Sequence, residues 1–151
     1  MIRPTRVSAI LAVLIFSLTG CDNPFGPKSD LESARDRWES RGPASYSYTV
    51  SRGCFCPMEA IGPVTVVVKN GVVESRRYTE TGVAVPDNYT AIFPNVEGLF
   101  AQIDNARRNK VDGLDTAFDN QYGFPTRINV DVKTEWADDE YAYTVKNFVA
   151  R

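Results

Sequence analysis

The sequence contains no histidine among its 151 residues. This absence removes Ser-His-Asp and Cys-His catalysis, every zinc site with a histidine ligand, and the side chain that most often serves as a general base near neutral pH. The remaining residues form no convincing catalytic constellation either. We therefore expect a protein that is not an enzyme and that carries no cofactor.

The sequence also lacks a cluster of lysine and arginine. Its formal net charge is −2, and the first twenty residues contain Arg3 and Arg6 but no acidic residue. Without these twenty residues the side-chain charge is about −4. A mildly acidic domain does not have the charge distribution of a nucleic-acid binder, and anionic lipid headgroups repel it. We expect no nucleic-acid partner, and attachment to a membrane has to come from a lipid.

The N-terminus has the features of a secretory signal peptide. Six residues with two positive charges precede an apolar run from Val7 to Leu18. This run is shorter than the roughly twenty residues that a membrane-spanning helix needs. The alternatives are a buried apolar helix or an uncleaved anchor. The run ends in Leu18, Thr19, Gly20 and Cys21, a sequence that resembles the lipobox that bacterial signal peptidase II cleaves before the cysteine.

The lipobox predicts three segments: a signal peptide (1–20), a lipidated N-terminus with a tether (21–28) and a single domain (29–151). The thiol of Cys21 takes the lipid, and acyl chains such as palmitate then hold the protein at the membrane. The tether spans at most about 25 Å when it is extended. We expect a lipoprotein of the bacterial cell envelope on the extracytoplasmic side of a membrane. Asp22 resembles an inner-membrane retention signal, and the choice between inner and outer membrane stays open.

Two amphipathic helices are predicted. The first begins at a capping box of Ser29 and Glu32 and ends before Gly42-Pro43, and Asn95 can cap the second. Arg35 lies off the apolar face of the first helix, so we expect alanine to be tolerated there. The apolar faces consist of Leu31, Ala34 and Trp38 in the first helix and of Val96, Leu99, Phe100, Ile103 and Ala106 in the second.

Three strands are predicted after each helix. In the first half, Tyr46, Tyr48 and Val50 alternate with polar residues, and Asn70-Gly71 between two valine-rich runs predicts a hairpin. The fold class is α+β, with two amphipathic helices packed on one face of an antiparallel sheet of about six strands in the order α-βββ-α-βββ. The expected strands cover residues 45–50, 64–68, 72–78, 113–118, 125–132 and 140–148.

Several short motifs lie on these elements. They comprise the helix positions Leu31, Ala34, Arg35 and Trp38, the strand Tyr46-Ser-Tyr followed by Arg52-Gly-Cys-Phe-Cys56, the helix start Val96-Glu97-Gly-Leu-Phe100, and Phe118-Asp119 leading to Gly123-Phe-Pro-Thr126. With these motifs, the chain after its leader resembles a family of small bacterial lipoproteins built on a domain of unknown function. The resemblance implies the fold and the location, and it implies no activity.

Cys54 and Cys56 can pair only with each other within one chain if Cys21 is acylated, and export places them where disulfides persist. In an extended strand, residues two apart have Cα atoms about 6.5–7 Å apart, at the outer edge of the range that a disulfide can bridge. A bond therefore needs a local bend, which Gly53 and Pro57 could supply.

Four roles are open for Cys54 and Cys56. The leading one is a local structural clip, which adds little stability because the loop that it closes is so short. A redox couple is the second, although the pair lacks the CxxC motif at a helix start that lowers a thiol pKa. Binding of Cu(I) with Met58 is the third, since two or three soft ligands suit Cu(I) but are too few for a closed zinc site. Free or intermolecularly bonded thiols are the fourth.

An acidic run, Asp138 to Glu140, could join Asp131 in a cation site or supply paired carboxylates, but such runs are far more often solvated loops. Our leading functional hypothesis is a lipid-anchored envelope module, not an enzyme, that binds a protein or a small ligand. The alternatives are an exported thiol redox protein and a Cu(I)-binding lipoprotein that use the cysteine pair.

Overall fold

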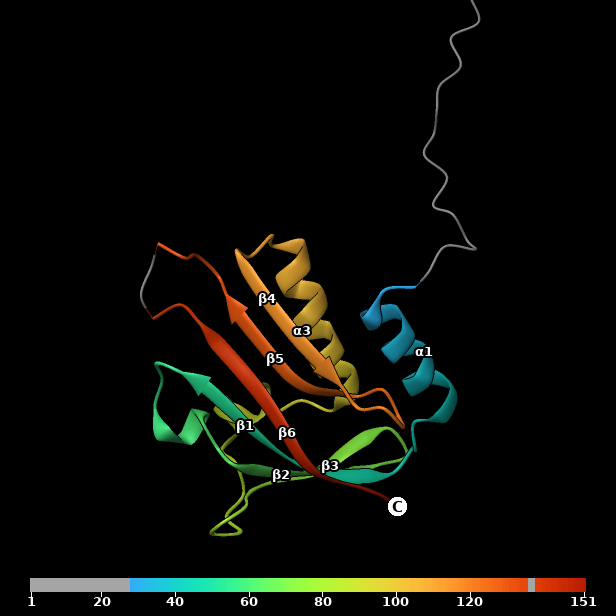
Figure 1. Ribbon diagram of the computed structural model, residues 1–151. Helices are drawn as coiled ribbons and strands as arrows, with labels where there is room; N and C mark the ends of the chain where they lie inside the picture. Colours follow the sequence, from blue (N-terminus) through green and yellow to red (C-terminus); the bar gives the residue numbers. More distant parts are fainter. Residues whose placement is uncertain (1–27, 136–137) are drawn as a thin grey trace, which may run out of the picture.

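The computed structural model describes residues 28–135 and 138–151, which form one antiparallel sheet with helices against one of its faces (Figure 1). The predicted signal peptide, the lipobox and Cys21 lie outside the described residues. The elements are α1 (Asp30–Arg41), β1 (Tyr46–Cys54), the 3-10 helix η1 (Met58–Ala60), β2 (Val64–Lys69), β3 (Val72–Tyr78), α2 (Asp87–Thr90), α3 (Val96–Arg108), β4 (Gly113–Phe118), β5 (Pro125–Asp131) and β6 (Tyr141–Ala150).

The sheet has six strands in the order β3-β2-β1-β6-β5-β4, so the predicted α+β class with an antiparallel sheet is confirmed. Each half of the chain supplies three consecutive strands, and the halves join where β1 pairs with β6. This pairing runs from Tyr46 opposite Ala150 to Cys54 opposite Tyr141, with a bulge on the way. At the bulge Asn147 has a φ of 54°, a left-handed conformation that asparagine tolerates better than most residues.

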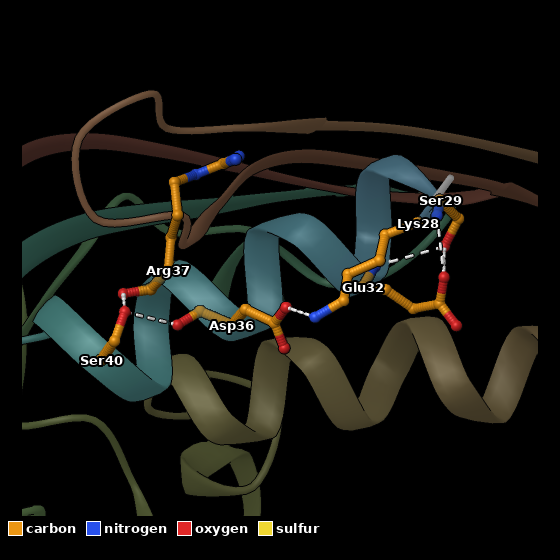
Figure 2. Close-up of polar contacts among 6 residues, drawn as sticks. All are labelled: Lys28, Ser29, Glu32, Asp36, Arg37 and Ser40. Carbon is orange, nitrogen blue, oxygen red and sulfur yellow. Dashed lines mark hydrogen bonds and ion pairs between the residues drawn. The ribbon is translucent and has the colours of Figure 1, made fainter. Parts of the chain in front are cut away.

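Helix α1 begins as predicted. The Ser29 hydroxyl accepts from the backbone N–H of Glu32, and the Glu32 carboxylate accepts from the backbone N–H of Ser29 at 2.7 Å (Figure 2). The Ser29 hydroxyl also donates to this carboxylate, and the two hydrogen bonds that the carboxylate accepts from Ser29 lower the pKa of the Glu32 carboxyl, because they stabilise its charged form. One turn further, Lys28 and Asp36 form an ion pair along the exposed side of the helix (Figure 2). The buried residues of α1 are the three that were predicted, Leu31, Ala34 and Trp38.

Helix α3 and the first hairpin also follow the prediction. The Asn95 side chain accepts from the backbone N–H of Gly98 at 3.0 Å, and all five predicted apolar positions of α3 are buried. In the hairpin, Asn70 and Gly71 have φ angles of 50° and 78°, as a two-residue turn between twisted strands requires. Four strands end at other residues than predicted: β1 runs to Cys54 instead of residue 50, β2 runs to Lys69, β5 ends at Asp131 and β6 runs to Ala150.

The prediction of two helices is wrong in number. The turn-rich stretch before α3 contains the four-residue helix α2, and the 3-10 turn η1 follows the cysteine pair. Each starts directly after a proline, Pro86 or Pro57, whose φ of −58° suits the entry to a helix. Both are too short to carry an apolar stripe, which is why hydrophobic spacing could not reveal them. Within the described ranges, no helix has the length and apolar character needed to cross a membrane.

Arg35 makes a contact that the helix spacing did not predict, while its expected tolerance of alanine stays a prediction. Its guanidinium donates to both carboxylate oxygens of Asp104 on α3, at 2.9 and 3.0 Å, and lies 4.8 Å from the centre of the Phe100 ring. Arg35 therefore connects the two long helices. Because both charged groups remain about one-third exposed, the pair adds only about 0.2–1 kcal/mol of stability.

Candidate functional site

The motif residues of both halves meet in an aromatic cluster between α1 and the inner face of the sheet. We define this cluster as Trp38, Tyr46, Phe124 and Phe148. The Trp38 ring lies edge-on to the other three, at centroid distances of 5.3, 6.4 and 6.2 Å respectively. Phe124 stacks on Phe148 at 4.3 Å. Edge-on and offset-stacked contacts are the favoured geometries of aromatic pairs, so the cluster is tightly packed core.

Hydrogen bonds occupy the polar groups of this cluster. The indole nitrogen of Trp38 donates to Glu97 at 3.0 Å, and the Tyr46 hydroxyl accepts from the backbone N–H of Val96 at 3.1 Å. These bonds attach the start of α3 to α1 and β1. Burial raises the pKa of the Tyr46 and Tyr48 hydroxyls, since a phenolate loses its hydration there. Both tyrosines stay neutral and structural at physiological pH.

Gly123 explains a second part of the motif set. Its φ of 88° is left-handed, and an added Cβ would lie 2.1 Å from the Ala34 carbonyl oxygen and 2.9 Å from the Cβ of Arg37. Only glycine lets the loop between β4 and β5 approach α1 so closely. Asp119 holds the loop by accepting from the backbone N–H of Tyr122. The motif residues Trp38, Tyr46, Gly123 and Phe124 thus specify packing.

The cysteine pair lies at the opposite end of β1. The Sγ atoms of Cys54 and Cys56 are within bonding distance and their Cα atoms are 5.3 Å apart, which is shorter than in an extended strand. A local bend was expected, and it is present at Phe55 and Cys56. Gly53 does not supply this bend. It remains within β1, where it pairs with Ala142 of β6, and it has no left-handed φ. The expected role of Gly53 is therefore wrong.

Met58, the third residue of the suggested Cu(I) site, is 75% exposed and lines a different hollow, beside Gly62 and Tyr78. The hollow next to the cysteine pair is lined by residues 54 to 57 alone. Throughout residues 28–135 and 138–151, no three side chains of Cys, Asp or Glu lie close enough together to hold a metal ion.

A groove of about 680 Å³ opens on the outer face of the sheet, the face that the helices leave bare. Its lining residues come from β1, β6, β5 and β4, at the end where β1 stops and β6 begins, and from the adjoining loops, and no helix residue is among them. Figure 1 shows where these four strands lie in the sheet. One row of the groove floor joins Gly53 to Ala142, Ala142 to Asn129, and Asn129 to Asp115 by strand pairing. Gly53 has no side chain and Ala142 has only a methyl group, so little covers the backbone in this part of the row. This lack of side chains produces the hollow.

Apart from the amide of Asn129, the side chains around the groove are mainly apolar or acidic. Phe55 is 84% exposed and lines the groove beside Cys54. The charged residues of the lining are Asp115, Asp131, Asp138 and Glu140. Three of the four acidic residues that the sequence singled out are thus brought to one groove, while Asp139 does not line it.

Asp115 and Asp131 differ in how they are held. Asp115 accepts from Arg127 at 3.1 Å and from Asn129 at 3.2 Å, so its charge is balanced. The Oδ1 atom of Asp131 is buried and accepts no hydrogen bond from the part of the chain that the structure describes. A buried acceptor without a partner costs free energy, and Oδ1 of Asp131 therefore has the capacity to accept a hydrogen bond from a bound molecule.

The groove escaped the sequence reasoning because its parts are distant in the chain. Gly53, Gly113 and Ala142 meet only through the strand order and register, which no local pattern specifies. One signal was present: residues 127, 129 and 131 alternate with buried Ile128 and Val130, which predicts that they share the solvent face of β5. That pattern shows the face and does not show the hollow.

The fold is thus a single open antiparallel sheet, helix-covered on one face and grooved on the other. Residues 30–150 match a family of unknown function (DUF6174). The chain belongs to this family, and the predicted membership of a family built on a domain of unknown function is confirmed. Comparison with curated proteins found no match, and comparison with solved structures found none either.

Proposed function

We propose that this protein is an exported, lipid-anchored module of the bacterial cell envelope, not an enzyme, and that it binds a protein or a small ligand in the groove on the bare face of its sheet. The observation that carries the proposal is the groove itself. Its volume of about 680 Å³ lies within the range of small-molecule sites, roughly 300–1,000 Å³. Its lining combines apolar surface with a few polar groups, which is the usual composition of such sites.

The location in this proposal rests on the N-terminal sequence. Cys21 of the lipobox carries the lipid, the membrane is the partner through that lipid, and nucleic acid is not a partner. We expect Cys21→Ala to abolish incorporation of labelled palmitate and to leave the full-length precursor uncleaved. A Cys21→Ala protein that still incorporates the label would contradict the assignment of the anchor.

The binding site can be mapped without knowing the natural ligand. Amide NMR spectra of the exported protein, purified in a neutral detergent, are recorded with a fragment library that contains cations, neutral molecules and anions. We expect fragments that bind to shift amides of Gly53, Gly113, Asn129 and Ala142. Shifts that concentrate elsewhere would show that the groove is not the site.

A variant that fills the groove provides the control. An added Cβ at Gly53 lies 3.5 Å from the Ala142 Cβ, an ordinary contact, so Gly53→Val is expected to fold and to cover the floor. Ser51→Val changes the same face of β1 outside the groove and serves as the matched control. Fragment binding should disappear in the first variant and persist in the second. Equal binding by both variants would overturn the proposed site.

A thiol redox protein is the second candidate function. Cys54 and Cys56 are only partly buried, and Cys54 lines the groove, so a bound substrate would meet the pair. Insulin reduction or thiol-oxidation turnover that is lost in Cys54→Ser would replace the binding proposal with this one. A Cu(I)-binding lipoprotein remains a third possibility. It requires a reduced pair and predicts that Met58→Leu weakens Cu(I) binding.

A further inference from the structure

We infer that the ligand of the groove is an organic cation with an apolar body, such as an aromatic amine. This inference rests on the proposed function, because it names the chemical class that the same groove takes. It follows from two independent features of the lining, its charge and its apolar surface.

The charge of the groove has one sign. All four of its charged lining residues are acidic, and neither lysine nor arginine lines it. The Asp115 carboxylate is balanced by Arg127 at 3.0 Å. Asp131, Asp138 and Glu140 form no ion pair with any residue that the structure describes. A concave surface with an uncompensated negative charge attracts cations and repels anions, because low-dielectric walls focus the field.

The apolar surface excludes a bare metal ion as the occupant. No three carboxylates of the described chain converge on one point, as a hard divalent cation requires. Instead the acidic groups border a floor of glycine, alanine and backbone, with the exposed ring of Phe55 at the β1 end. An organic cation matches both parts: its ammonium group faces the carboxylates, and its body covers the floor. The ring face of Phe55 can also attract the cation directly.

A neutral ligand fits less well than a cation of the same shape. Covering the floor would bring an apolar body next to the carboxylate of Asp131 and remove part of its remaining hydration. Loss of hydration around a charge is costly unless a partner of opposite charge replaces the water. The charge of the ligand should therefore change the affinity even when the body stays the same.

Three indoles with nearly the same body test how the charge of the ligand changes its affinity. Tryptamine is a cation, tryptophol is neutral, and indole-3-acetate is an anion. Each is titrated into the exported protein, and the amide shifts of Gly53, Gly113, Asn129 and Ala142 are followed. We expect tryptamine to bind most tightly, tryptophol more weakly, and indole-3-acetate least. The advantage of tryptamine should shrink as salt is added, since the groove is open to solvent.

Neutral isosteres test which residues set the preference. The double variant Asp131→Asn, Glu140→Gln keeps the shape of the groove and should weaken tryptamine binding about fivefold while it leaves tryptophol unchanged. Glu74→Gln is the matched control, because it removes one negative charge from β3 at the far edge of the sheet. Melting curves of all variants verify that they are folded.

The outcomes separate this inference from the proposed function. If the three indoles shift the groove amides equally, or the anion binds best, the charge inference is wrong. The groove then remains the binding site as long as Gly53→Val abolishes binding. If no fragment and none of the indoles shifts the groove amides, both the inference and the proposed function fall.

Discussion

The aromatic cluster on the inner face and the groove on the outer face lie on one sheet, yet they are built in opposite ways. The cluster consists of large rings whose polar groups are bonded within the protein, such as Trp38 to Glu97. The groove has small residues such as Gly53 and Ala142 in its floor, and three of its four bordering carboxylates, those of Asp131, Asp138 and Glu140, form no ion pair within the described residues. The comparison teaches that the aromatic motifs of this chain specify its packing, whereas the motif Arg52-Gly-Cys-Phe-Cys56 supplies one end of the binding surface, which residues outside any motif, such as Gly113 and Ala142, complete through strand pairing.

The largest effect is expected at Trp38. Replacement with alanine removes the ring that contacts three other aromatic residues, and it also removes the hydrogen bond to Glu97. We expect the free energy of unfolding, measured with urea, to fall by about 3–5 kcal/mol. Arg41→Ala, at an exposed position of the same helix, should change it by less than about 0.5 kcal/mol. If the midpoint of urea unfolding is the same for Trp38→Ala as for the unchanged protein, the aromatic cluster does not contribute the stability that distinguishes the inner face from the outer face.

Gly123→Ala tests the close approach that the cluster requires. The new Cβ meets the Ala34 carbonyl oxygen at 2.1 Å, and the residue has a left-handed φ. We expect a loss of about 2–4 kcal/mol from strain and overpacking together. Gly82 also has a left-handed φ, of 69°, but no atom lies within 4 Å of an added Cβ. Gly82→Ala should therefore cost only the strain of a left-handed backbone, about 1–2 kcal/mol. Equal losses of stability in both variants would argue against the close contact between Gly123 and Ala34.

The buried tyrosines of the inner face predict an alkaline weakness. Burial raises the pKa of Tyr46 and Tyr48 above the ordinary value of about 10, so the folded protein keeps their protons after the unfolded chain has lost them. This contribution is complete below pH 10 and is lost as the pH rises toward the folded values. We expect the free energy of unfolding to fall by about 2 kcal/mol between about pH 10 and 11. Tyr48→Phe should make this fall in the free energy of unfolding with pH smaller. An unchanged fall would show that Tyr48 does not keep its proton in the folded protein as proposed.

The smallest stability effect is expected at the cysteine pair. We predict that the exported protein contains a Cys54–Cys56 disulfide and that replacing both residues with serine costs less than about 1.5 kcal/mol, because so short a loop hardly restricts the unfolded chain. Amide exchange should rise from Arg52 to Met58 while the helices stay protected. Intact mass after alkylation checks the bond. Two alkylated thiols without reductant would show a free pair and would favour the Cu(I) alternative.

Much of the fold could be predicted because its signals are local. Capping residues such as Ser29 and Asn95, the turn at Asn70-Gly71 and the apolar spacing of α1 and α3 all act within a few residues, and the structure confirms each of them. The groove was not predictable because its floor is assembled by pairing across the sheet. Gly53, for example, suggests a bend when it is considered alone, and it becomes the floor of the groove only when Ala142 lies beside it.

The pairing of β1 with β6 also determines how far apart in the chain the residues of the central seam lie. β1 and β6, the first and last strands of the sheet, form its middle, so Tyr46 has to pair with Ala150, 104 residues further along the chain. Until then each half exposes an apolar face, and contacts over such long separations form slowly. A variant that lacks residues 142–150 would keep α1, α2, α3 and the strands β1 to β5, and it would lack the seam that joins the two halves of the sheet.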